Sequence, residues 1–383
     1  MTELTLEAVD VVDDNVLPTN VFNTNKTDYA HTANHSLFCG EEPGLFDTVH
    51  RNFPVIWEHY KNMKSLDWDE LEFDFTPCNL EFKQVPEAIS KCMIRTLAWQ
   101  WEADSIAANT LLPVMAPFIS APELQALYGR ITDNEVLHAA TYSEIVRCSF
   151  DDPNMVLNEV LQVKEAMQRL ATVGKVLGRV KRLSAMLSLG LVQRTDPDVY
   201  DAVIMAEVAF LVLERIQFMA SFAVTFAIGE TGVFMPIAKA VQKICQDEYE
   251  IHQAAHKDVL RHELKLAVGR DSFKRMHGSV KELIDEVVAS ELAWTDYALE
   301  GDPLVGLTRA KLKDWVLWSA KDVYDFFGIK SEYTFPKQQP LPYMERWMDI
   351  SKTQASPQEQ QNGQYKVGIL KRDDEGVEFA VEW

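Results

Sequence analysis

Two pairs of glutamate and histidine are the residues of this sequence best suited to metal chemistry. Glu135 precedes His138 by three positions, and Glu248 precedes His252 by four. Either spacing places the carboxylate and the imidazole on one face of a helix. A further carboxylate precedes each pair on a separate apolar stretch: Asp104 before the first and Glu214 before the second.

Together these six side chains form the ligand set of a dinuclear iron or manganese site in a helical bundle, with ligands from four helices. Carboxylates and imidazoles suit both metals, and open positions on such a centre allow dioxygen to bind. One Glu–His spacing alone arises easily by chance. Two pairs, each with an upstream carboxylate, are far more specific.

Composition narrows the classes of function. The chain has 383 residues, of which 47% are apolar and 25% charged, and its formal net charge is -21. This balance argues against nucleic acid as a partner, because phosphate binding needs clustered Lys and Arg, and it disfavours an anionic membrane surface. The five cysteines contain no C-x-x-C pair, which indicates reduced thiols and no zinc site. The first residues have no basic or apolar signal pattern, so we expect a cytoplasmic protein.

The sequence divides into three parts. We expect an extended arm over residues 1–43, a helical domain over 44–347 and a flexible, polar tail over 348–383. Ser120, followed by proline and Glu123, predicts a capping box at the start of the helix that carries the first pair. The patterns predict helices over 86–109, 154–190, 197–228, 234–263, 279–299 and 309–327.

The stretch Met205–Ile228 is apolar and long enough to cross a bilayer. It also contains Glu207, Glu214 and Arg215, which would be costly in lipid. We therefore expect a helix buried in a protein core. A lone buried carboxylate is strongly unfavourable, and a metal ion would give Glu214 a partner.

These motifs resemble one known family, the radical-generating small subunit of class I ribonucleotide reductase. The resemblance covers about residues 36–347, with a weaker match at Tyr365–Gly368. Its motifs are Trp68–Asp74, Ala103–Ile106, Ile119–Leu124, Asn134–His138 with Tyr142, Leu213–Phe218 and Gln246–Glu248.

The resemblance implies an all-α, ferritin-like bundle whose core holds a dinuclear metal site. In the family this site generates the radical that starts ribonucleotide reduction, the step that makes deoxyribonucleotides. One metal would be held by Asp104, Glu135 and His138, and the other by Glu214, Glu248 and His252, with Glu135 and Glu248 as bridges. The presence of Tyr142 favours two iron ions, with manganese–iron and dimanganese pairs as alternatives, and dioxygen as oxidant.

Tyr142 lies one helical turn after His138, and in the family this tyrosine holds a stable radical. Phe218, Phe222 and Ile244 match the apolar residues that shield it, although ordinary core packing would look the same.

The resemblance also implies that the oxidising equivalent leaves the subunit. Trp68 and Asp247 match an internal relay toward His138, and Tyr365 matches a tyrosine of the tail. The last residues, Phe379–Trp383, would dock on a separate large subunit that binds the ribonucleotide. A homodimer is also implied.

The second pair departs from the family pattern by one residue between Glu248 and His252. A π-bulge could keep the imidazole directed at the metal, or a regular helix could use the i, i+4 spacing directly. His256, one turn further on, is expected beside the ligands or at the surface.

Two other hypotheses remain open. One is a dinuclear oxygenase or oxidase on the same bundle, which acts directly on an organic substrate. The other is a helical scaffold without catalysis, whose Glu–His pairs are only salt bridges.

Overall fold

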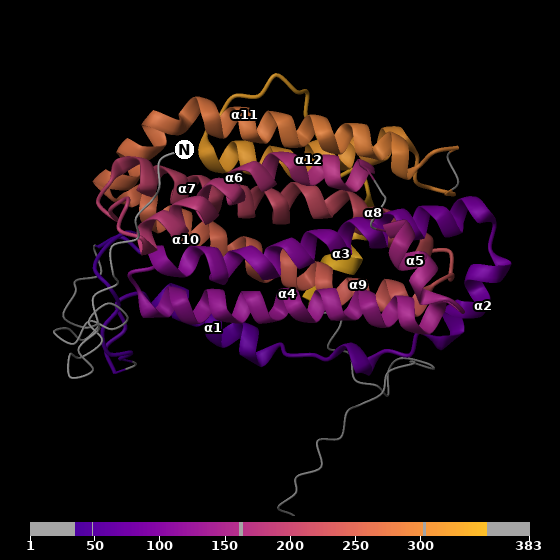
Figure 1. Cartoon of the computed structure of the whole chain (residues 1–383). Coiled ribbons are helices and arrows are strands. Elements are labelled where there is room, and N and C mark those ends of the chain that lie inside the picture. Colours follow the sequence, from indigo (N-terminus) through magenta and orange to yellow (C-terminus); the bar gives the residue numbers. More distant parts are fainter. Residues whose placement is uncertain (1–34, 48, 161–163, 302–303, 351–383) are drawn as a thin grey trace, which may run out of the picture.

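The protein is a bundle of long helices (Figure 1). The computed structural model describes residues 35–47, 49–160, 164–301 and 304–350. Within these ranges the only β-pairing is an isolated bridge between Phe38 and Ile119. The α-helices are α1 (Pro54–Ser65), α2 (Thr76–Gln84), α3 (Glu87–Met115), α4 (Pro122–Ser149), α5 (Pro153–Val160), α6 (Lys164–Ser188), α7 (Pro197–Val212), α8 (Phe218–Gly229), α9 (Met235–Gln246), α10 (Gln253–Lys265), α11 (Ala267–Ala298), α12 (Arg309–Phe327) and α13 (Pro342–Met348).

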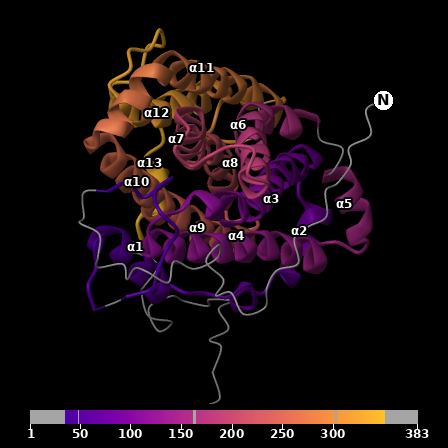
Figure 2. The same cartoon turned by 60° about the vertical axis from the view of Figure 1, so that its left-hand side comes forward.

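Four helical units form the centre of the bundle: α3, α4, α7 with α8, and α9 with α10. Helix α3 packs against α4 and α8, while α7 packs against α10. Helices α6, α11 and α12 cover one side and α1 the other, so α7 and α8 lie inside the molecule (Figure 2). The expected all-α bundle is confirmed.

Burial on all sides explains the apolar character of α7 and α8. Every residue of α8 is buried, so this helix has no polar face. Ala, Val and Phe along it pack against neighbouring helices instead of solvent or lipid. No helix in the described part of the chain is long and apolar enough to span a membrane.

Two π-helical turns interrupt the central helices. The first, Leu213–Gln217, joins α7 to α8 and will be called the α7–α8 π-turn. The second, Asp247–His252, joins α9 to α10 and will be called the α9–α10 π-turn. The bulge considered for the extra residue before His252 is therefore present. The α7–α8 π-turn was not expected from the sequence.

Several predicted boundaries are wrong. Ser120 does not cap α4: the N-cap is Ala121, and Ser120 Oγ accepts a hydrogen bond from the Gly40 N–H at 2.6 Å. The chain segment before α1 uses this hydroxyl to hold its place beside the α3–α4 loop. Helix α3 continues past the expected end at Asn109 to Met115, and α11 begins at Ala267, before the expected start at residue 279.

A buried ion pair connects the outer helices to the α7–α8 π-turn. Arg169 of α6 donates to Glu291 of α11 through Nε at 2.7 Å and Nη2 at 2.6 Å. Its guanidinium lies between two indoles, 3.6 Å from the Trp99 ring centroid and 3.9 Å from that of Trp294. Nη2 also donates to the Gln217 carbonyl at 2.8 Å. The side chain thus ties α6, α11 and the end of that turn together.

This arrangement predicts a large effect of Arg169→Met on stability. The change leaves Glu291 as a buried, unpaired carboxylate, so the free energy of unfolding in urea should fall by about 3–5 kcal/mol. Arg275→Met is the matched control: it breaks a pair with Asp201, but Arg275 is 47% exposed, and the loss should stay under about 1 kcal/mol. Equal, small losses for both variants would contradict the assignment.

Candidate metal centre

The six expected ligand residues meet in the middle of the bundle. They form two overlapping groups whose nitrogen and oxygen atoms lie within 4.8 Å of one another, and every member is buried. Only Glu135 and Glu248 belong to both groups, as bridging ligands would. The first group contains Asp104, Glu135, His138 and Glu248, and the second contains Glu135, Glu214, Glu248 and His252.

Both imidazoles present the same nitrogen to the carboxylates. His138 Nδ1 lies 2.8 Å from Glu248 Oε1, and His252 Nδ1 lies 2.7 Å from Glu248 Oε2. Each Nε2 points outward to an acceptor, Asp247 Oδ2 at 3.2 Å for His138 and Asn134 Oδ1 at 2.8 Å for His252. An outer partner of this kind fixes the tautomer and leaves the inner nitrogen to bind metal.

The two π-turns position three of the six ligands. Glu214 lies in the α7–α8 π-turn, and Glu248 and His252 both lie in the α9–α10 π-turn. Because a π-turn contains one residue more than an α-turn, it rotates the following side chains around the helix axis. The extra residue before His252 is thereby absorbed without turning the imidazole away from the cluster.

Charge makes the cluster costly without cations. Burial raises the pKa of Asp104 and of Glu214 well above the usual range, and the adjacent carboxylates raise both pKa values further. Glu248 presents one oxygen to each imidazole, and Glu135 Oε1 lies 3.3 Å from His252 Nδ1, so the carboxylate oxygens meet the imidazole nitrogens and one another inside the cluster. Buried oxygens of this kind suit direct ligation, and four ionised carboxylates would balance two divalent cations. The donor set therefore fits a dinuclear centre.

Tyr142 is fully buried beside this cluster. Its hydroxyl lies beside the Asp104 carboxylate. Burial and the negative charge of Asp104 raise the pKa of the phenol well above 10, so it stays protonated. A cavity of about 10 Å³ at this site is lined by Ile94, Leu97, Ala98, Trp101, Tyr142, Val146, Phe150 and Val156. The surroundings of the ring are therefore largely apolar.

The three residues expected to shield Tyr142 lie in the same core. Phe218, Phe222 and Ile244 are completely buried, and the two phenyl rings stack with their centroids 5.6 Å apart. Their shielding role stays a prediction.

Trp68 and Asp247 form a connected path to the cluster. The indole N–H of Trp68 donates to Asp247 Oδ2 at 2.7 Å, and the same oxygen accepts from His138 Nε2. The rings of Trp68 and His138 also stack, with centroids 6.1 Å apart. Tyr365, the remaining residue of the expected relay, lies outside the described residues.

Asn134 has a position that sequence reasoning missed. It accepts from His252 and donates to Asp247 Oδ2 at 3.2 Å, so one amide links both halves of the site. The sequence offered one indication of this role: Asn134 directly precedes the expected ligand Glu135 on the same helix.

His256 is not at the surface. It is completely buried, and its Nδ1 lies 3.1 Å from Glu207 Oε2. The surface alternative for this residue is therefore wrong. His256 also stands outside the two groups of potential ligands.

Comparisons with known proteins agree with this geometry. A family model described as "Ribonucleotide reductase, small chain" matches residues 46–340. The ribonucleoside-diphosphate reductase subunit beta of Haemophilus influenzae is 24% identical over 366 residues, which cover 91% of this chain and 95% of that protein.

Two solved structures share the fold. The ribonucleotide reductase R2 subunit from Clostridium botulinum matches with a TM-score of 0.73 at 15% identity, covering 82% of this chain and 95% of that one. Streptococcus sanguinis dimanganese(II)-NrdF matches with a TM-score of 0.65 at 10% identity, covering 79% of this chain and 99% of that one.

The fold and site together define a ferritin-like protein built around a dinuclear metal centre. The chain belongs to the family of ribonucleotide reductase small chains. It is accordingly the small subunit of a ribonucleoside-diphosphate reductase, an oxidoreductase. Membership in a small-chain family implies a large subunit as partner.

The shared and unshared ligands should differ in their effect on metal binding. We expect the unaltered protein to bind two Mn²⁺ per chain and the Asp104→Ala variant to keep one, because Asp104 belongs to the first group only. The Glu248→Ala variant should lose tight binding of both ions, because Glu248 belongs to both groups. Metal analysis after gel filtration measures this, with circular dichroism to verify folding. Asp285→Asn, a change outside the cluster, is the control. Two equivalents retained by a folded Glu248→Ala protein would contradict the ligand assignment.

Proposed function

We propose that this subunit uses a diiron centre and dioxygen to generate a radical on Tyr142 and to store it for the large subunit. The observation that carries the proposal is the position of Tyr142: fully buried, one turn from His138, and beside the Asp104 carboxylate. When bound, the metal pair would supply the oxidising equivalents from dioxygen. The apolar surroundings would keep water and reductants from the phenoxyl radical.

The protein controls the proton that accompanies this oxidation. Because burial and Asp104 keep the Tyr142 phenol protonated, the ring must lose a proton together with its electron. Asp104 is the carboxylate that acts most strongly on the phenol, and we assign it as the acceptor.

We propose that Trp68, Asp247 and His138 carry the oxidising equivalent out of the core. The Asp247 carboxylate accepts from both the indole and the imidazole, so a proton can shift along these bonds as an electron moves between the rings. Tyr365 would continue the path into the large subunit, and residues 348–383 would dock there.

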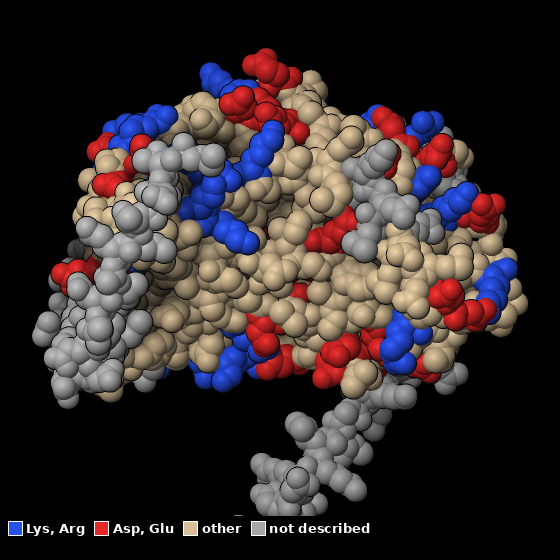
Figure 3. Space-filling model, viewed as in Figure 1, with Lys and Arg blue, Asp and Glu red and all other residues tan. Residues whose placement is uncertain are grey.

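The metal pair and the assembly are also part of the proposal. Iron is favoured by the presence of Tyr142, while the dimanganese(II) neighbour supports manganese as the alternative. We propose a cytoplasmic homodimer. The face in Figure 3 has a broad centre with few charged side chains, which suits contact with a second copy. A sedimentation mass of a single chain would contradict the dimer.

The two other hypotheses have less support. A catalytically inert scaffold would not need four carboxylates buried together at one point. A substrate oxygenase is favoured by neither the family match nor the names of the relatives.

The Tyr142→Phe variant tests the radical assignment. It should bind metal as the unaltered protein does, lose the stable tyrosyl doublet in the electron paramagnetic resonance spectrum, and fail to support ribonucleotide reduction with the cognate large subunit. Tyr324→Phe is the control, since Tyr324 is equally buried but on α12. Full activity in Tyr142→Phe would show that the radical resides elsewhere.

Deletion of residues 364–383 tests the docking role of the tail. Association with the large subunit, measured by sedimentation, should be lost, and the tyrosyl doublet should remain. Loss of the radical in the shortened protein would instead indicate a structural role for these residues.

A further inference from the structure

A second layer of polar side chains lies next to the metal cluster along the same helices. Tyr128 is seven residues before Glu135 on α4, Glu207 is seven before Glu214, and His256 is four after His252. Spacings of seven and four keep a side chain on the same helix face, and seven residues advance about 10 Å along the axis. The bundle thus places these three residues together, one level away from the ligands.

Hydrogen bonds connect this layer. The Tyr128 hydroxyl donates to Glu207 Oε1 at 2.5 Å, and His256 Nδ1 lies 3.1 Å from the other oxygen of the same carboxylate. All three side chains are completely buried. The rings of Tyr128 and His256 are 5.9 Å apart.

The pattern repeats once more at the end of the bundle. Tyr200 is seven residues before Glu207 on α7, and Glu263 is seven after His256 on α10. The Tyr200 hydroxyl donates to Glu263 Oε2. Glu263 also accepts from the Ser36 hydroxyl and from the Leu37 N–H, both at 2.7 Å. The segment that Glu263 holds in this way continues to Phe38, whose ring lies 6.4 Å from that of Tyr128, so the two layers are neighbours.

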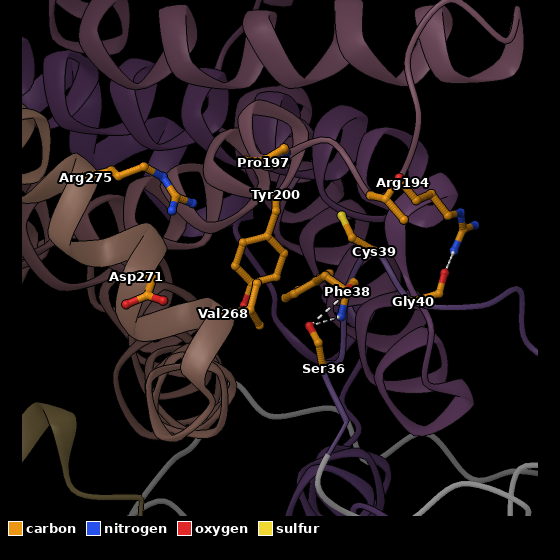
Figure 4. Close-up of a pocket in the computed structure, with 11 residues that line it drawn as sticks. Ser36, Phe38, Cys39, Gly40, Arg194, Pro197, Tyr200, Val268, Asp271 and Arg275 are labelled. Carbon is orange, nitrogen blue, oxygen red and sulfur yellow. Dashed lines mark hydrogen bonds between the residues drawn. The ribbon is translucent and has the colours of Figure 1, made fainter.

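The last layer opens to a surface pocket. Figure 4 shows Tyr200 in this pocket of about 310 Å³, between the start of α11 at Val268 and the segment that carries Cys39. Phe38, another lining residue, has its ring 6.4 Å from that of Tyr128. Aromatic rings therefore lead from the pocket to the layer beside the metal cluster.

We propose that Tyr128 and Tyr200 form a second redox chain, which carries single electrons from this pocket to the carboxylate–imidazole centre. The proposal rests on the proposed function, because that function makes the centre an oxidant. Each tyrosine has its own buried carboxylate as proton acceptor, so no proton needs to travel between layers.

Tyr128 gives one electron to the oxidised centre and its hydroxyl proton to Glu207, which leaves a neutral phenoxyl radical and a neutral carboxylic acid. Tyr200 then gives an electron to the Tyr128 radical and its own proton to Glu263, while Glu207 returns its proton to Tyr128. A small one-electron reductant in the pocket reduces Tyr200, and Glu263 returns the second proton. The net result is one electron moved from the reductant to the centre.

Two buried tryptophans of the core, Trp99 and Trp294, lack this arrangement. The indole N–H groups of Trp99 and Trp294 have no acceptor among the described residues, and the Arg169 cation lies on both rings. A neighbouring positive charge and the lack of a proton acceptor both oppose their oxidation. Trp68 resembles Tyr128 in donating to a buried carboxylate. Tyr128 is therefore suited to proton-coupled oxidation.

The test starts from the Tyr142→Phe background, loaded with iron in air and frozen at short times for electron paramagnetic resonance. We expect a transient tyrosyl doublet that disappears when Tyr128→Phe is added and weakens with Glu207→Gln. Adding Tyr324→Phe is the matched control, because Tyr324 is also buried and donates to a carboxylate, that of Asp285, while neither residue belongs to the two layers. It should leave the signal unchanged. Adding Tyr200→Phe should slow the loss of the doublet on addition of ascorbate.

No transient doublet in Tyr142→Phe, with the stable doublet present in the unaltered protein, would overturn the second chain and leave the proposed function standing. A measurement on metal-free protein tests the second redox chain independently of the proposed function. Val268 is 45% exposed on the pocket rim, so a ruthenium photo-oxidant can be attached to the Val268→Cys variant. Light should then produce a tyrosyl radical that is lost with Tyr200→Phe and whose spectrum changes with Tyr128→Phe. A radical independent of both tyrosines would overturn the chain, whatever the metal centre does.

Discussion

The burial of four carboxylates and two imidazoles at one point of the bundle is the constraint on which the rest depends. Unpaired charges of this kind are strongly unfavourable away from water, so the cluster needs cations, and the surrounding helices must hold its geometry without solvent. Completely buried α8 excludes water on one side. The two π-turns direct Glu214, Glu248 and His252 inward, and Arg169 fixes the end of the first turn from outside.

In the proposed redox scheme, the aromatic residues around the centre differ in the partner of the acidic hydrogen. Tyr142 lies in largely apolar surroundings beside Asp104, an expected metal ligand, and this suits a site where a radical is stored. Trp68 and Tyr128 each donate to a buried carboxylate, which suits sites through which charge passes. Trp99 lies beside a buried cation and its indole N–H has no acceptor among the described residues, so it is poorly suited to oxidation.

Sequence alone could predict the bundle and the meeting of the ligands, because helical periodicity and the Glu–His spacings are local properties. It could also anticipate the π-turn before His252, since an extra residue between two ligands must be absorbed somewhere. The α7–α8 π-turn contains a single ligand, Glu214, so no spacing between two ligands in the sequence reveals it. The role of Ser120 depends on Gly40, 80 residues away, and the burial of His256 depends on Glu207. Such pairings follow from packing between helices that periodicity does not specify.

Anomalous X-ray scattering from crystals of metal-loaded protein, recorded at the absorption edge of the bound metal, would locate the metal ions. We expect two peaks per chain, both in contact with Glu135 and Glu248, one also near Asp104 and His138 and the other near Glu214 and His252. A single peak, or peaks away from these six side chains, would contradict the dinuclear centre.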